Sequence, residues 1–540
     1  MRRLATGPGA SRLADVARMA LVWMICALAL SGCSLNLFGA APAPTPAPSP
    51  TPTAILYTCQ GAYLEANPVA AENTCPGTTA WGPNLSLGPD HAIEGYVSSA
   101  SVAAGQRVRL YVSTTAVSYT YAIYRMGYYQ GRGARLMYQS PSLSGIQQPA
   151  PTIDSVTHMV ECVWSHPATI TTERSWVSGV YVVKLVSSDK FMRYTLFVVR
   201  NAATPASILY VAPFLTYQAY NLWGGFSLYR GTEPDGVTLS SALRSYTVSF
   251  DRPYMKDGLS TFGLYDLPLL SWAESRGYNM TYAADFNLDG MSGSVSHYKL
   301  FIISGHSEYW SAGMRANATR ARDAGVSLAF FGANDVYWHV RLKASPMGSD
   351  REVVCYKHGY YDDGTRNSTD PLAASDPSAA TVLWRDPPLN QPEWTLLGEP
   401  YRYAVQGFQP LTLDKGSAPY LAGTSLAVGA SLSNLVGGEY DRADPTKSPA
   451  GLQIIASSVV HCASYCPHGA ADTATASIYT AASGAQVFDA GTFQWSWGLS
   501  DISAKGYVQA TNALAQITPV AQANSGFQRL TANILDAMMR

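Results

Sequence analysis

The hydrophobic pattern of this 540-residue chain changes character at about residue 200. Before that point, apolar and polar residues alternate in short runs such as RVRLYVS, where Val108, Leu110 and Val112 share one face of a strand. The runs GVYVVKL and RYTLFVVR are dense in β-branched and aromatic residues, and clusters of Gly, Pro and Ser separate the runs. The pattern predicts a β-sandwich domain over residues 57–203.

After residue 203, short unbroken apolar runs are separated by segments with helical signals. The apolar runs are SILYVAP, YTVSF, NMTYAA, KLFIISG and SLAFFG. Of the segments between them, DLPLLSWAESRG begins with Asp266 and a proline in its first turn, and SAGMRANATRARDAG ends on Gly325. Strands that alternate with helices predict an α/β domain over residues 204–540, with a mainly parallel, doubly wound sheet of the amidotransferase-like kind.

The first 33 residues have the features of a secretory leader. Several arginines precede the apolar stretch MALVWMICALAL, which is short for a membrane span and has the length of a signal-peptide core. It ends in LSGC, which resembles a bacterial lipobox, and an ordinary signal peptide with an incidental cysteine is the alternative. We predict a signal peptide over residues 1–32, lipidation of Cys33 and a Pro-rich tether over residues 33–56. Such a protein would be lipid-anchored outside the cytoplasmic membrane, at the cell envelope or cell surface.

Six cysteines follow this leader, an even number that is compatible with disulfides in an exported chain. Cys59 and Cys75 are the first pair that we expect to be joined. In HCASYCPH, Cys462 and Cys466 lie between two histidines, which could form a zinc site. A local disulfide or plain structural cysteines suit an oxidising compartment better.

Polar residues directly follow two of the predicted parallel strands. His306 and Glu308 come after KLFII in SGHSEYW, and Asn334 comes after SLAFF in FFGANDVYW. In open α/β sheets, ligands bind beyond the carboxyl ends of the strands. We therefore expect these three side chains to converge on one rim of the sheet. The alternative for His306 is a neutral histidine that is hydrogen-bonded at a strand end.

Several familiar functional classes are disfavoured by the sequence. It has no G-x-S-x-G elbow, no H-E-x-x-H, no Walker loop and no G-x-G-x-x-G in a strand-to-helix turn. The formal net charge of -1 gives no electrostatic reason to expect a nucleic-acid partner.

Tyrosines stand beside polar residues in the second half of the chain. The segment FLTYQAYNLWGGFSLY contains Tyr217, Tyr220 and Asn221, and SFDRPY ends in Tyr254. Phenolate and carboxylate oxygens are hard anionic donors, and an ion such as Fe(III) would bind them by lowering the tyrosine pKa from about 10. With 34 tyrosines in the chain, packing in the core or at the surface is the simpler explanation of any chosen pair.

Taken in order, YRMGYYQGRGARL, YQAYNLWGG, SFDRPY, SGHSEYW, GANDVYW and GGEYDR resemble the large (beta) subunit of N,N-dimethylformamidase and its relatives, chiefly their C-terminal part. The resemblance covers about residues 120–500. It implies a mononuclear Fe(III) held by two tyrosinates and one glutamate, an arrangement that hydrolyses an amide. By motif the ligands would be Tyr220, Tyr254 and Glu308, with Tyr217 as the alternative to Tyr220. The sequence departs from the expected pattern at Ser307, where close relatives would have proline.

The same resemblance implies roles for the polar residues around the iron. His306 would take a proton from water and deliver one to the amine leaving group. Asn334, and Glu439 of GGEYDR, would orient the substrate or the water.

These observations predict a membrane-anchored, exported, metal-dependent hydrolase of C–N bonds that acts on a small amide. No nucleic-acid partner is expected, and a homo-oligomer is compatible with the sequence. The alternative is an inactive surface lipoprotein that binds carbohydrate or another ligand by stacking it on Trp223, Trp310 and Trp338.

Overall fold

The computed structural model describes residues 55–56, 59, 61–201, 206–259, 261–291, 295–357, 370–464, 470–502 and 523–540, and residues from Pro52 onward form one compact unit. The predicted signal peptide, Cys33, most of the Pro-rich tether and the predicted domain boundary at residues 203–204 lie outside the described residues. Among the helices that the structure describes, none combines the length and the apolar character needed to cross a membrane.

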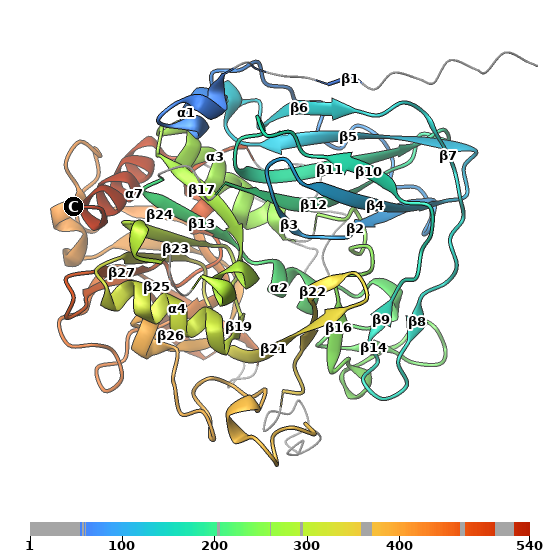
Figure 1. Cartoon of the computed structure of the whole chain (residues 1–540). Coiled ribbons are helices and arrows are strands. Elements are labelled where there is room, and N and C mark those ends of the chain that lie inside the picture. The colour runs from blue at the N-terminus through green and yellow to red at the C-terminus, as the bar shows by residue number, and fades with distance from the viewer. Residues whose placement is uncertain are drawn as a thin grey trace, which may run out of the picture. The chain divides into compact units, whose positions relative to one another are not determined.

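Two facing sheets form the N-terminal part of the described chain (Figure 1). Their strands are β1 (Ile55–Leu56), β2 (Ile93–Val97), β3 (Ser101–Ala103), β4 (Arg107–Thr114), β5 (Ser118–Met126), β6 (Ala134–Gln139), β7 (Leu143–Ser144), β10 (Ala168–Thr171), β11 (Gly179–Ser187) and β12 (Met192–Arg200). The larger sheet has the order β1-β6-β5-β11-β12-β3, with β7 paired to β5, and the smaller sheet has the order β10-β4-β2. Only the pairing of β12 with β3 is parallel among the pairings that the structure describes in these two sheets.

The larger sheet has a hydrophobic core on each of its faces. Tyr181 and Val183 of β11 pack with Val108 and other residues of the smaller sheet. The alternate residues of β11, among them Val182, belong to a second core cluster that also contains Ile208 of the C-terminal part. The N-terminal and C-terminal parts of the described chain therefore share one continuous core.

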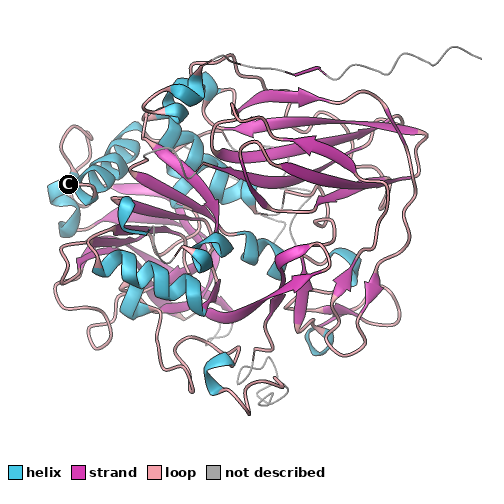
Figure 2. Ribbon diagram, viewed as in Figure 1, coloured by secondary structure: helices cyan, strands magenta, loops and turns pink. Residues whose placement is uncertain are grey.

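A nine-stranded mixed sheet forms the centre of the C-terminal part (Figure 2). Its strands are β13 (Ile208–Ala212), β17 (Met280–Ala284), β18 (Leu300–Ser304), β20 (Ser327–Phe331), β23 (Tyr401–Leu413), β24 (Ser431–Asp441), β25 (Gln453–Ser464), β26 (Ala471–Thr480) and β27 (Gln486–Asp489). In the order β17-β13-β18-β20-β27-β26-β25-β23-β24, the first five strands run parallel and the remaining pairings are antiparallel.

The expected fold class, a β-sandwich followed by a doubly wound, mainly parallel, amidotransferase-like α/β domain, is therefore wrong. The described chain is mostly β and contains several mixed sheets. The sheet is not mainly parallel because the strands β23, β24, β25 and β26 add to one side of its parallel strands by antiparallel pairing. Buried and exposed residues mix along β24, as is typical of antiparallel strands with one face turned to solvent.

Short sheets and helices complete the described chain. The remaining strands are β8 (Thr152–Ile153), β9 (Val160–Glu161), β14 (Gly231–Thr232), β15 (Leu239–Ser240), β16 (Thr247–Ser249), β19 (Tyr309–Ser311), β21 (Trp338–Ser345) and β22 (Gly348–Val354). The α-helices are α1 (Pro68–Glu72), α2 (Phe214–Ala219), α3 (Leu267–Ser275), α4 (Ala312–Asp323), α5 (Trp394–Leu397) and α7 (Ser525–Met538). Helices α3 and α4 lie where the sequence predicts helices.

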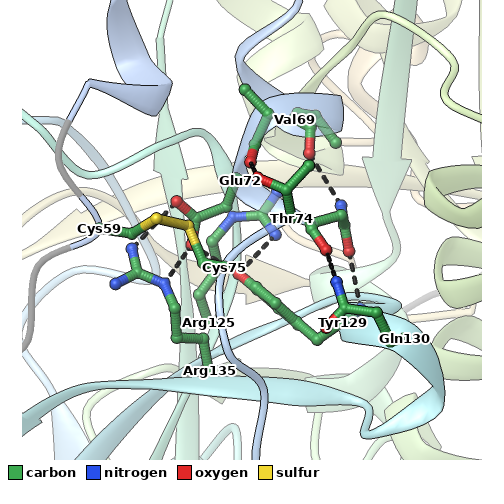
Figure 3. The surroundings of a disulfide bond; sticks show 11 residues. Cys59, Val69, Glu72, Thr74, Cys75, Arg125, Tyr129, Gln130 and Arg135 are labelled. Atoms are coloured by element: carbon green, nitrogen blue, oxygen red, sulfur yellow. Dashed lines mark hydrogen bonds and ion pairs between the residues drawn. A yellow bond between two sulfur atoms is a disulfide. The ribbon is translucent and has the colours of Figure 1, made fainter.

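A disulfide joins Cys59 to Cys75, which confirms the predicted pair. Beside it (Figure 3), Glu72 at the end of α1 accepts hydrogen bonds from Nε of Arg135 at 2.5 Å and from the Tyr129 hydroxyl at 2.8 Å. The disulfide and this buried cluster fix the start of the described chain against β6. Elsewhere, Cys462 is disulfide-bonded, whereas Cys466 lies outside the described residues.

Candidate functional site

The carboxyl ends of the neighbouring parallel strands β13, β18 and β20 lie on one rim of the nine-stranded sheet. Helix α2 follows β13, and Tyr220 is the residue directly after it. His306 and Glu308 follow β18, and Asn334 follows β20. Glu439, in the antiparallel strand β24, reaches the same rim through a contact with Asn334. The structure thus brings together five of the residues that the sequence proposes for the site.

Glu308 is the acceptor at the centre of this group. The Tyr220 hydroxyl donates to Oε2 of Glu308 at 2.9 Å. The Tyr229 hydroxyl lies 2.6 Å from Oε1 and 2.7 Å from Oε2, and the rings of the two tyrosines are 4.4 Å apart. The backbone N–H of Glu308 donates to Oγ1 of Thr216 at 3.0 Å, which ties the glutamate to α2. Three oxygen-bearing side chains therefore converge at one point.

His306 is held with one ring nitrogen facing this point. Its Nδ1 lies 2.9 Å from the carbonyl oxygen of Ala333, which can only accept, so Nδ1 carries a hydrogen. Nε2 lies 3.0 Å from Oε2 of Glu308 and 3.2 Å from the Tyr220 hydroxyl. Burial opposes protonation, but the hydrogen bond and charge of Glu308 and the charge of Glu439 outweigh it and raise the pKa of His306 to about 9.

Asn334 connects the rim to β24. Its Nδ2 donates to Oε2 of Glu439 at 2.8 Å, and its backbone N–H donates to Oδ1 of Asp441 at 3.0 Å. Burial, with the nearby charge of Glu308 as a further contribution, raises the pKa of Glu439 to about 7. The backbone of Asn334 has a φ of 56°, a left-handed conformation that asparagine adopts more readily than most residues.

The site opens into a small pocket of about 70 Å³. The residues that line it are Tyr220, Leu228, Tyr229, Arg244, Glu308, Asn334, Tyr337, Trp338, Lys357, Tyr401 and Glu439. Nζ of Lys357 lies 3.4 Å from the centre of the Tyr229 ring and 4.8 Å from that of Trp338. The pocket therefore combines aromatic walls with charged groups of both signs.

Tyr254 and Tyr217, two of the candidate ligands, do not line this pocket. Tyr217 is buried beside Asp266, and burial raises its pKa well above the usual value. Tyr254 is buried beside Gln218. Of the two tyrosines at the end of α2, only Tyr220 thus reaches Glu308.

Tyr229 is the residue that reasoning from the sequence missed. It is the last residue of FLTYQAYNLWGGFSLY, nine positions after Tyr220. Gly224 and Gly225 have φ values of 76° and 91°, a conformation that residues with a Cβ rarely adopt. The glycine pair marks a turn between Tyr220 and Tyr229. This pair was the feature of the sequence that could have indicated that the chain folds back between the two tyrosines.

The three tryptophans of the binding-protein alternative are dispersed. Trp338 lines the pocket. Trp310 is fully buried, with its indole N–H donating to Ser307, and the Trp223 indole donates to Glu94 at 2.8 Å. Only one of the three tryptophans is therefore placed to stack on a ligand in this pocket.

The oxygens of Tyr220, Tyr229 and Glu308 could hold a metal ion. Bonds of about 2.0–2.2 Å from a first-row cation to oxygen place neighbouring ligand oxygens roughly 2.8–3.1 Å apart at right angles. The Tyr220 hydroxyl lies 2.9 Å from Glu308, within this range, and the Tyr229 hydroxyl lies 2.6 and 2.7 Å from the two Glu308 oxygens, slightly below it. Within the described ranges, no group of three or more His, Cys, Asp or Glu residues could hold a metal ion. Two tyrosines and one glutamate are the donor types that the resemblance leads us to expect, and the second tyrosine beside Glu308 is Tyr229, while Tyr254 does not line the pocket.

Comparisons with known proteins agree with the motifs. Residues 120–509 match the family model described as N,N-dimethylformamidase beta subunit-like, C-terminal. No curated protein matches the chain. Among solved structures, a cycloisomaltooligosaccharide glucanotransferase of Paenibacillus sp. complexed with cycloisomaltoheptaose is 9% identical over 44% of this chain and 45% of that chain. Its TM-score is 0.15, so this likeness carries no argument about fold or function.

Proposed function

The chain belongs to the N,N-dimethylformamidase beta subunit-like family, and from that premise we propose that it hydrolyses the C–N bond of a small amide. The observation that carries the proposal is the convergence of the Tyr220 and Tyr229 hydroxyls on Glu308, with Nε2 of His306 3.0 Å from the same carboxylate. A nitrogen base beside a cluster of anionic oxygen donors, at the wall of a small pocket, suits water-dependent cleavage of an amide.

Tyr220, Tyr229 and Glu308 would hold a ferric ion in this proposal. When bound, such an ion supplies a Lewis acid that polarises the amide carbonyl and lowers the pKa of water from its free value of about 15.7. Glu308 would also fix the position of the ion relative to α2, because its backbone N–H donates a hydrogen bond to Oγ1 of Thr216.

The polar residues of the rim would handle the proton and the substrate. Against the effect of burial, the hydrogen bond and charge of Glu308 raise the pKa of His306 and keep a proton on Nε2. A cation held by Glu308 would offset that charge, and His306, whose Nδ1 is fixed to Ala333, would then be neutral and able to accept the proton of the attacking water on Nε2. It would then give that proton to the amine nitrogen as the C–N bond breaks, so the products are a carboxylic acid and an amine. Asn334 has a buried Oδ1 with no hydrogen-bond partner among the described residues, and this oxygen could accept an N–H group of the substrate. Glu439 would hold Asn334 in place.

Lipidation of Cys33 would place this hydrolase outside the cytoplasmic membrane. The support is the lipobox-like LSGC followed by the Pro-rich stretch APAPTPAPSPTPTA. Replacing Cys33 with alanine should release the protein from the membrane fraction, and an unchanged distribution would place the anchor elsewhere.

The test of the proposed activity separates the metal from the base. Glu308→Ala should lose iron and hydrolysis together, because it removes an anionic donor. His306→Ala should keep about one iron per chain and lose hydrolysis, because His306 moves a proton and holds no metal in this proposal. Wild-type protein that contains no stoichiometric metal after loading with iron would overturn the proposal. The rival interpretation, an inactive surface binding protein, would then stand.

A further inference from the structure

Two cationic side chains line the same pocket as Glu308, and the proposed chemistry does not use them. Lys357 is buried, and its amino group lies over the rings of Tyr229 and Trp338. Arg244 comes from a different segment, at the end of a 3-10 turn between β15 and β16. Binding a neutral amide does not require a cationic side chain in addition to the proposed metal ion.

Arg244 is prepared for an anionic ligand by its surroundings. Its guanidinium lies 5.5 Å from the centre of the Tyr246 ring, and one NH2 group donates to the carbonyl oxygen of Tyr356 at 3.4 Å. Its Nε is buried with no hydrogen-bond partner among the described residues. Within the described ranges, Arg244 forms no ion pair with a carboxylate. Because Nε is buried, the terminal NH2 groups of this stacked guanidinium are the donors that a carboxylate in the pocket would meet.

The charge of the pocket points the same way, and this step rests on the proposed function. A ferric ion with three charges would be matched by two phenolates and Glu308. Arg244 lines the pocket and has no ion pair among the described residues, so its charge is not among those matched by the ion and its three ligands. Because aromatic side chains form much of the lining, the charge of Arg244 attracts an anion more strongly than it would at an exposed surface.

The pocket volume limits the size of the ligand. A water molecule needs about 10–15 Å³ of this kind of space, so a pocket of about 70 Å³ holds roughly five to seven small atoms. That is the size of a short acylated amino acid. We propose that the substrate is a small amide that carries a carboxylate, such as an N-formyl amino acid, and that Arg244 is the residue that binds this carboxylate.

The test compares two probes that differ only in charge, N-formylglycine and N-formylglycinamide. Binding is measured by calorimetry on the His306→Ala protein, which removes the proposed base and keeps the pocket. We expect the Kd of N-formylglycine to be at least about tenfold lower than that of N-formylglycinamide. A hydrogen-bonded ion pair in a partly buried site strengthens binding by about this factor or more. The preference should shrink as salt is added, because ions screen the charge of the pocket.

Variants of Arg244 decide whether this residue is responsible. Arg244→Met should bring the two affinities close together, and Arg244→Lys should keep part of the preference because it keeps the charge. Arg109→Met is the matched control, since Arg109 is exposed on β4 and lies outside the residues that line the pocket. Equal affinity for the two probes, or an unchanged preference in Arg244→Met, overturns the inference.

The outcome can be separated from that of the proposed function. Wild-type protein that holds iron and hydrolyses both probes with equal kcat/KM would overturn the carboxylate preference and leave the hydrolase proposal standing. Selective binding of N-formylglycine by a wild-type protein without iron or turnover would support the Arg244 subsite and overturn the hydrolase proposal.

Discussion

Glu308 is within hydrogen-bonding distance of three side chains, those of Tyr220, Tyr229 and His306. Burial alone would raise its pKa, but the hydrogen bond and charge of His306, the charge of Lys357 and the hydrogen bond from Tyr229 outweigh it, and the pKa of Glu308 is lowered. The two phenols lose their hydrogens if they bind a cation. The same oxygens then repel one another unless a positive charge lies between them, which is why the tyrosines and the glutamate should act as one unit.

The identity of the tyrosine ligands can be tested by removing single hydroxyl groups. Tyr220→Phe and Tyr229→Phe each delete one donor beside Glu308, so each should deplete iron and weaken the visible phenolate-to-iron absorption. Tyr217→Phe and Tyr254→Phe should leave both properties unchanged, because their hydroxyls lie outside the pocket. Elemental analysis and absorbance of iron-loaded protein give the answer. Iron loss in Tyr254→Phe with full iron in Tyr229→Phe would restore Tyr254 as the ligand.

Asn334 has a backbone role as well as a side-chain role. Asn334→Gly keeps the left-handed backbone at low cost and removes the hydrogen bond to Glu439, so it should lower activity with little loss of stability. Asn334→Ala should lose activity and, in addition, about 1–2 kcal/mol of stability, because a Cβ is strained in this conformation. Hydrolysis rates and chemical denaturation of both variants check this. Equal stability of the two variants would show that the backbone at this position relaxes.

At the scale of the elements, the spacing of apolar residues and the positions of glycine, proline and helix-capping residues predicted the strands and helices that surround the site. RVRLYVS, GVYVVKL, KLFIISG and SLAFFG correspond to β4, β11, β18 and β20, because strands of this length keep their pattern whatever they pair with. Pairing direction does not follow from the pattern of one strand. The antiparallel half of the nine-stranded sheet was missed for that reason, and the expected parallel sheet was wrong.

The site was predictable to the extent that its residues follow strands. The placing of His306, Glu308 and Asn334 at one rim follows from strand ends, which a sequence marks clearly. Tyr229 and Arg244 reach the pocket from loops folded back by turns, and no local pattern marks which loop residue will face a strand end. Such contacts depend on the whole fold.

Helix α4 begins directly after β19, beside the site, and its start depends on Ser311. The Ser311 hydroxyl accepts a hydrogen bond from the backbone N–H of Met314 at 3.1 Å and donates to Asp289. Ser311→Ala removes both bonds and should lower the free energy of unfolding by about 1–2 kcal/mol. Ser311→Thr keeps the hydroxyl and is the control. The two variants are compared by urea denaturation, and equal stability would mean that the cap contributes nothing.

At the scale of the whole molecule, Glu399 is a buried carboxylate that forms no ion pair among the described residues. Glu399 is fully buried, accepts a hydrogen bond from Oγ1 of Thr475 at 2.7 Å, and has its pKa raised by burial to about 8. An acid whose pKa is higher in the folded than in the unfolded state binds more protons when folded. Its contribution to stability is therefore present at low pH and is lost as the pH rises from about 4.5 to about 8.

Neutralising Glu399 should remove this part of the pH dependence. Glu399→Gln keeps an acceptor for Thr475 and carries no charge, so it should raise the melting temperature at pH 9 by about 2 °C or more and change it little at pH 5. Thermal unfolding of the wild type and the variant over this range is the measurement. A shift that is the same at both pH values would mean that Glu399 is not titrating.

The N-terminal and C-terminal parts of the chain are joined by a buried ion pair as well as by their shared core. Arg125 of β5 and Glu274 of α3 are 2.7 Å apart with both side chains fully buried, and the Tyr282 hydroxyl also donates to Glu274. Removing one partner leaves the other charge uncompensated in a medium of low dielectric constant, which costs about 3–5 kcal/mol. Because the core is continuous across this boundary, the described chain should also unfold in a single transition rather than part by part.

Arg125→Met should therefore cause a large loss of stability, and a second substitution should reverse most of it. In Arg125→Met/Glu274→Gln neither member of the ion pair is charged, while the glutamine carbonyl can still accept from Tyr282, so we expect more than half of the lost free energy of unfolding to return. Urea denaturation followed by tryptophan fluorescence and by circular dichroism measures both quantities, and the two signals should change together. If the double variant is as unstable as Arg125→Met, the shape of the arginine side chain holds the two parts together, and the balance of charge does not.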